Sequence, residues 1–128
     1  MIPEGAAFPE RVPDLLHELP RALGLAWTSS GDDLPDLDEV EGAVRRLGQK
    51  RVLAPDVLPS VVAYIGELIR RRVGGEWTTH DSGQGHEPDL MVRGSRCGVM
   101  GVYKEILEYG RAVSLRAFVE HHVRVRKG

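Results

Sequence analysis

The segment HDSGQGHEPD, residues 80–89, places two histidines and three carboxylates close together in the chain. Its possible metal ligands are His80, Asp81, His86, Glu87 and Asp89. Imidazole nitrogens and carboxylate oxygens bind zinc and other transition metals, and a folded hairpin would bring such side chains together. Their spacing matches no metal-binding signature, however, and a polar segment with glycine, serine and proline is typical of a solvated turn. We therefore predict neither a metal site nor a cofactor.

A second candidate is the segment Tyr64-Ile65-Gly66-Glu67, which places a glycine inside an expected helix. An interior glycine costs a helix up to about 1 kcal/mol relative to alanine, which indicates close packing at that position. The simplest interpretation is that the sheet or another helix packs against Gly66, and that Glu67 pairs with Arg70 or Arg71. In a functional alternative, a groove is lined by Tyr64, Glu67 and Trp77.

Motifs for nucleophilic catalysis or phosphate binding are missing from the sequence. Cys97, the single cysteine, is expected in a strand, where a lone thiol more often packs as a small hydrophobic group than attacks a substrate. There is no G-x-S-x-G motif. Gly83-Gln84-Gly85 is too short for a P-loop and lacks the lysine that such a loop requires. We assign no catalytic residue and do not expect an enzyme.

Charge is distributed unevenly along the chain. The net charge is only −2, but residues 1–41 hold ten acidic residues against two basic ones, a local charge of −8, so the remainder carries +6. In one interpretation the two parts neutralise each other on the folded surface. In the other, the acidic part is a surface that attracts a basic partner. The second interpretation predicts a partner-binding surface made of Asp32, Asp33, Asp36, Asp38, Glu39 and Glu41.

Composition also restricts where the protein acts and what it binds. A nearly neutral chain with two Trp, two Phe and three Tyr is not expected to bind nucleic acid. No apolar run reaches the roughly 18–20 residues that cross a bilayer, and the first residues lack the pattern of a signal peptide. We therefore expect a cytoplasmic protein that does not enter membranes.

The leading hypothesis is a non-enzymatic protein-binding module, whether adaptor, regulatory subunit or inhibitor of a basic toxin or nuclease. The alternative is a small enzyme or a metal- or ligand-binding domain that uses His80, His86 and Glu67 around a cleft. A homodimer in which the acidic part of one copy meets the basic part of another is also compatible with the sequence.

Proline, glycine and capping residues divide the N-terminal half into helices. Residues 1–11 are expected to form an extended arm, and the first helix is expected to begin near Pro13 and to kink or break at Pro20. Asp36 is expected to cap a second helix that Gly48 ends. Residues 49–55 form a linker or short extended segment, and Asp56 caps a third helix that ends at Gly74-Gly75.

After this helix, β-branched and aromatic residues predict strands at Glu76–His80, Leu90–Val92 and Arg96–Met100. A helix over Val102–Tyr109 and a last helix capped by Ser114 complete the chain. Because the strands are consecutive, the sequence predicts an α+β fold with N-terminal helices, a three-stranded antiparallel meander and C-terminal helices. A chain of 128 residues fits a single domain.

Residues 57–122 combine a helix containing a Gly-Glu pair, a glycine stop, a strand carrying tryptophan and a later pattern Lys-x5-Gly-x3-Ser-Leu-x2-Phe. The matching residues are Gly66, Glu67, Gly74, Gly75, Trp77, Lys104, Gly110, Ser114, Leu115 and Phe118. In these features the chain resembles a group of small bacterial α+β domains of unknown function. The resemblance leaves the acidic N-terminal part unmatched and supplies no catalytic residues. It implies an accessory or immunity-like protein that binds another molecule.

Overall fold

The computed structural model describes residues 5–26, 34–83 and 85–127. The fold is α+β: helices come first, a three-stranded antiparallel sheet follows, and helices complete the chain. This order confirms the predicted fold class.

The first helix, α1 (Phe8–Leu23), begins earlier than expected. Where we predicted an extended arm up to residue 11, a 3-10 turn at Gly5–Ala7 leads directly into the helix, which runs unbroken past Pro13. Phe8 and Val12 account for the earlier start, since both side chains are buried in the core. Apolar burial of this kind outweighs the helix-breaking pattern of the local sequence.

The second helix, α2 (Leu37–Leu47), has the boundaries that its capping residues predict. The carboxylate of Asp36 accepts a hydrogen bond of 3.0 Å from the backbone N–H of Asp38, and Gly48 ends the helix. This N-cap satisfies one of the backbone donors that the first turn of every helix leaves without a partner.

Two predictions fail between α2 and the longest buried helix. A short helix, α3 (Gln49–Val52), occupies part of the segment expected to be a linker. The next helix, α4 (Leu58–Val73), has Val57 at its N-cap position, whereas Asp56 instead pairs with Arg51 at 2.7 Å. The prediction fails because Asp56 can pair with the guanidinium of Arg51 instead of capping the helix. A rule based on capping preferences does not take such a pair into account.

The sheet consists of β1 (Glu76–Asp81), β2 (His86–Val92) and β3 (Ser95–Cys97), in that spatial order. β2 begins at His86, inside the expected loop, because its first residues pair with the end of β1. β3 is shorter than predicted. In the register, Trp77 lies opposite Leu90 and His80 opposite Glu87.

The chain ends with α5 (Gly101–Tyr109), a 3-10 turn at Gly110–Ala112 and α6 (Leu115–Lys127). As predicted, Ser114 caps α6, since its hydroxyl accepts a hydrogen bond of 3.1 Å from the N–H of Ala117.

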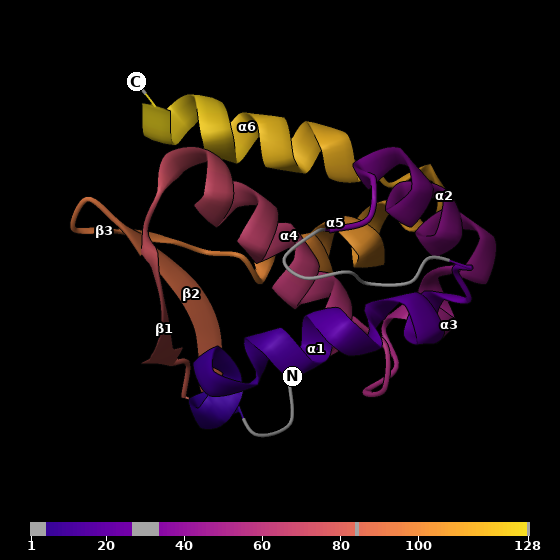
Figure 1. The fold of residues 1–128 in the computed structure, drawn as a ribbon, viewed down its shortest axis with the longest axis horizontal. Coiled ribbons are helices and arrows are strands. Elements are labelled where there is room, and N and C mark those ends of the chain that lie inside the picture. The colour runs from indigo at the N-terminus through magenta and orange to yellow at the C-terminus, as the bar shows by residue number, and fades with distance from the viewer. Residues whose placement is uncertain (1–4, 27–33, 84, 128) are drawn as a thin grey trace.

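The helix α4 lies at the centre of the molecule and contacts α1, α5, α6 and β2. In Figure 1, α4 runs between α1 and α6, the sheet lies at the end where α4 and α6 terminate, and α2 and α3 lie at the opposite end. The core residues of α4 have no measurable exposure: Val61, Val62, Ala63, Tyr64, Ile65 and Ile69. Among the described residues, no helix combines the length and apolar character needed to cross a membrane.

Candidate functional site

The carboxylates at the start of α2, which we call the acidic end of α2, are Asp36, Asp38, Glu39 and Glu41. The first three are exposed and Glu41 is partly buried. A helix N-terminus carries partial positive charge, so carboxylates in its first turn are favoured there even without a ligand. The other two residues predicted for this surface, Asp32 and Asp33, lie outside the described residues.

The acidic end of α2 is attached to the core through Tyr64. The hydroxyl of this fully buried residue donates a hydrogen bond of 2.6 Å to the carbonyl of Pro35, just before the helix cap. The pKa of the Tyr64 phenol is raised, first by its burial and then by the nearby negative charge of Asp36. The position of the carboxylates is therefore fixed by the core, and their negative potential extends into it.

Arg116 of α6 pairs with the acidic end of α2. Its guanidinium donates to Oδ1 of Asp38 at 2.7 Å, and its backbone N–H donates to Oε1 of Glu41 at 3.1 Å. Arg45 lies 3.5 Å from the other oxygen of Glu41. The two guanidinium groups therefore pair with two of the four carboxylates, and the acidic surface is neutralised in part.

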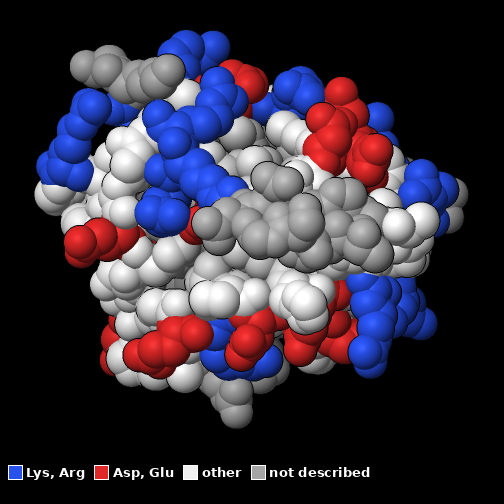
Figure 2. Space-filling model, in the orientation of Figure 1, with Lys and Arg blue, Asp and Glu red and all other residues white. Residues whose placement is uncertain are grey.

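The opposite end of the molecule is rich in arginine. Figure 2 shows Asp and Glu residues over α2 and Lys and Arg residues over the end where α4 and α6 terminate, with further Lys and Arg residues at the end of α2 and α3. Most of these arginines are already engaged: Arg70 and Arg71 pair with Glu67, Arg72 pairs with Glu120, and Arg93 donates to the carbonyl of Arg126. Acidic and basic side chains are therefore paired within the protein at both ends.

Of the three residues of the predicted groove, Tyr64 and Glu67 are buried and Trp77 is partly buried. Tyr64 has no exposure and Glu67 is 6% exposed. The indole N–H of Trp77 donates to Oε1 of Glu67 at 3.1 Å, and Arg70 donates to both carboxylate oxygens. Burial alone would raise the pKa of Glu67, but hydrogen bonds from Arg70, Trp77 and Arg71 outweigh it and lower the pKa to about 2. This carboxylate is ionised, and both of its oxygens accept hydrogen bonds from side chains of the protein.

Gly66 makes this arrangement possible. A Cβ at this position would lie 2.2 Å from Cη2 of Trp77, so the indole rests directly on the helix backbone. The predicted close packing at Gly66 and the predicted pairing of Glu67 with Arg70 and Arg71 are both confirmed.

The residues proposed for an alternative catalytic cleft are not brought together. Side chains alternate between the two faces of a strand, so His80 lies on the opposite face of β1 from Trp77, the residue that contacts Glu67. Nδ1 of His80 contacts Oδ2 of Asp89 instead, and His86 is exposed at the end of the hairpin. Within the described part of the chain, no cluster of three or more His, Cys, Asp or Glu side chains could hold a metal ion.

One partner in these contacts escaped prediction from the sequence. Arg116 lies 78 residues from Asp38, and no local pattern signals a pair at that distance. The hairpin was expected to bring His80 and Asp89 close together, and Asp89, which is 1% exposed, contacts His80 from a diagonal position, because the register pairs it with Thr78. Burial raises the pKa of the Asp89 carboxyl, and its hydrogen bond with His80 opposes that effect.

The remaining nucleophile, Cys97, is buried and contacts Nδ1 of His122 at 3.6 Å. Burial raises the pKa of this thiol, and burial together with the charge of Arg126 lowers the pKa of His122 to about 4. Both groups are therefore neutral near pH 7, unlike the thiolate and imidazolium of a cysteine enzyme.

Comparisons of the chain with protein-family models, with curated proteins and with solved structures found no match. The resemblance to small bacterial α+β domains therefore stays a prediction, and any function has to be inferred from the geometry of the molecule itself.

Proposed function

We propose that the protein is a non-enzymatic binding module that recognises the basic surface of another protein through the acidic end of α2. The observation that carries this proposal is the rigid presentation of four carboxylates on one helix end. Inhibition of a basic nuclease or toxin is one form of this function, and an adaptor or regulatory subunit is another.

Rigid presentation favours binding because less conformational freedom is lost on association. The Asp36 cap and the bond from Tyr64 to Pro35 hold the start of α2. A partner would therefore meet carboxylates that are already in place.

The contact between Asp38 and Arg116 leaves room for a partner. The side chain of Asp38 is 70% exposed and that of Arg116 is 48% exposed. Ion pairs between exposed side chains contribute little to stability, so a basic group of a partner can replace Arg116 at low cost. Fields of this kind act mainly on association rate and specificity, and salt screens them.

The test compares two variants that lose the same number of charges. The first removes the acidic end with Asp36→Asn, Asp38→Asn, Glu39→Gln and Glu41→Gln, in which asparagine keeps the capping ability of residue 36. The control removes four carboxylates elsewhere, with Glu10→Gln, Asp14→Asn, Glu105→Gln and Glu108→Gln. A partner captured from the native cell with the tagged wild-type protein is identified, purified and titrated against each form.

We expect the first variant to bind at least about tenfold more weakly at low salt and to lose most of the salt dependence of the association rate. The control should retain both. Equal binding by the two variants, or binding that does not change with salt, would refute the proposal.

A further inference from the structure

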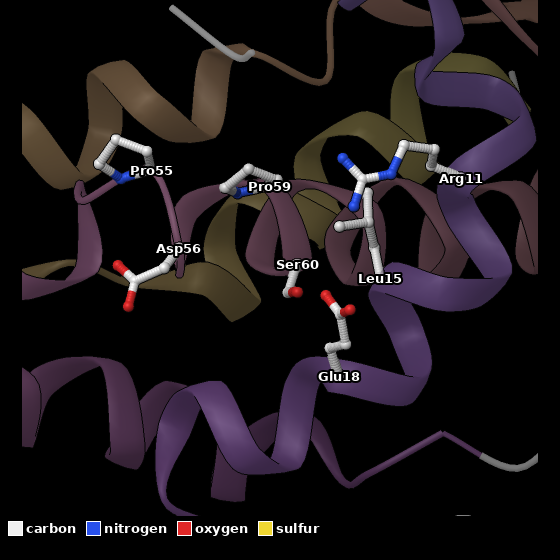
Figure 3. Close-up of a pocket in the computed structure, with 7 residues that line it drawn as sticks. All are labelled: Arg11, Leu15, Glu18, Pro55, Asp56, Pro59 and Ser60. Atoms are coloured by element: carbon white, nitrogen blue, oxygen red, sulfur yellow. The ribbon is translucent and has the colours of Figure 1, made fainter. Parts of the chain in front are cut away.

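A small pocket lies between α1 and the first turn of α4. Arg11, Leu15 and Glu18 line it from α1, where their spacing places them on one helix face, and Asp56, Pro59 and Ser60 line it from the other side. Its volume is about 200 Å³. Figure 3 shows the side chains of Arg11, Glu18 and Ser60 directed toward the same opening.

Ser60 is the unusual residue of this pocket. It is 2% exposed, yet its hydroxyl forms no hydrogen bond with any described residue. Among the described residues, only Nε of Arg126 is a side-chain polar atom that is both sealed from solvent and without a partner, so the Ser60 hydroxyl has access to the pocket. Buried hydroxyl groups nearly always have a partner, which indicates that something polar in the pocket completes this bond.

The charged side chains around Ser60 indicate what that partner is. The carboxylate of Glu18 and the hydroxyl of Ser60 are acceptors that suit an ammonium group with its three donors. The guanidinium of Arg11 suits a carboxylate, which it can bind through two N–H groups. Arg11 also has another interaction in the protein, and five N–H donors allow it to serve more than one acceptor.

The volume of the pocket and its apolar wall restrict the size and the chemical class of the ligand further. A cavity of about 150 Å³ admits benzene, and pockets for drug-sized ligands begin near 300 Å³, so this pocket suits a small metabolite. Leu15, which is 3% exposed, and Pro59 give it an apolar wall.

We infer that this pocket binds a free α-amino acid with an apolar side chain. Glu18 and Ser60 hold the ammonium group, Arg11 holds the carboxylate, and the side chain lies against Leu15 and Pro59. The pocket shares no residue with the acidic end of α2, so this inference and the proposed function can fail separately.

The test is a titration of the full-length, 15N-labelled protein with L-leucine, monitored through the backbone amide signals of Leu15 and Ser60. Two half-molecules serve as comparisons: 3-methylbutylamine, which lacks the carboxylate, and 4-methylpentanoate, which lacks the amine. We expect saturable shifts with leucine and at least about tenfold weaker binding of each half-molecule, because each loses charge-assisted hydrogen bonds.

Variants assign the contacts. Ser60→Ala and Glu18→Gln should each weaken leucine binding about tenfold, whereas Glu10→Gln, on α1 but outside the pocket, should leave it unchanged. If leucine produces no saturable shift, the pocket holds solvent only and the inference is wrong. Equally tight binding of the amine alone would also overturn it, since Arg11 would then have no role.

Discussion

The two ends of α4 differ in whether their buried polar side chains have hydrogen-bond partners within the protein. At the C-terminal end, Glu67 is bound by the indole of Trp77 and by two guanidinium groups, and its pKa is lowered to about 2. At the N-terminal end, Ser60 is buried even more deeply than Glu67, but its hydroxyl has no partner among the described residues. The same helix therefore carries a carboxylate, that of Glu67, whose hydrogen-bond partners are all supplied by the protein, and a hydroxyl, that of Ser60, which can bind a ligand.

This difference teaches which residues are worth considering for function. Glu67, Tyr64 and Trp77 are residue types that often form binding sites, but their polar groups already have partners. Trp77 donates to Glu67, and Tyr64 donates to the backbone carbonyl of Pro35. No pattern in the sequence marks Ser60, yet its hydroxyl is free to form a hydrogen bond with a ligand in the pocket. Substitution of a polar group that is hydrogen-bonded within the protein is expected to change stability, whereas substitution of one without a partner is expected to change ligand binding.

The largest effect is expected at the C-terminal end, from Glu67→Ala. The substitution leaves the indole N–H of Trp77 without its acceptor and removes the carboxylate that Arg70 and Arg71 share, so we expect a loss of about 3 kcal/mol in the free energy of unfolding. Urea denaturation at neutral pH measures this loss. Glu67→Gln keeps an acceptor for Trp77 and should lose clearly less; an equal loss would show that the indole bond contributes nothing.

Acid should weaken the same end of α4. The pKa of Glu67 is about 2 in the folded protein, against 4.5 for an unperturbed glutamate side chain. A depressed carboxyl pKa gives stability that is complete above the unfolded value and is lost as the pH falls toward the folded one. Between about pH 6 and pH 3 we expect Glu67 to account for roughly 2 kcal/mol of lost stability. Subtracting the pH profile of Glu67→Gln from that of the wild type isolates this contribution, and parallel profiles would contradict it.

Gly66→Ala tests the packing that brings Trp77 to Glu67. Alanine favours a helix over glycine by about 1 kcal/mol, which alone would stabilise α4. The added Cβ would lie 2.2 Å from an indole held between Phe8 and Glu67. Overpacking costs about 1–3 kcal/mol, and this contact is severe, so we expect a net loss of about 1–2 kcal/mol. A melting temperature equal to or above that of the wild type would show that the indole moves aside easily.

Local patterns predicted the C-terminal end of α4 well because the relevant residues are close in sequence. The glycine inside a helix indicated close packing, and the spacing of Glu67 from Arg70 and Arg71 indicated their pairing. The early start of α1 was not predictable in this way, since it depends on the contact between Phe8 and Trp77. The pocket at Ser60 was not predictable either, because it requires the packing of α1 against the start of α4.

The smallest effect is expected at the N-terminal end, and a matched pair of hydroxyl deletions on α4 measures it against the rest of the helix. Tyr64→Phe removes a buried hydrogen bond to Pro35 and should cost about 1–1.5 kcal/mol. Ser60→Ala removes a hydroxyl that has no partner among the described residues, so the free energy of unfolding should change by less than about 0.5 kcal/mol in the absence of ligand. L-leucine at a fixed concentration well above the Kd of the wild type should then stabilise Ser60→Ala by about 1.4 kcal/mol less than the wild type, because a ligand that binds only the folded state raises its stability in proportion to the binding free energy. If Ser60→Ala instead cost as much as Tyr64→Phe, the hydroxyl would be structural and the two ends of α4 would be alike.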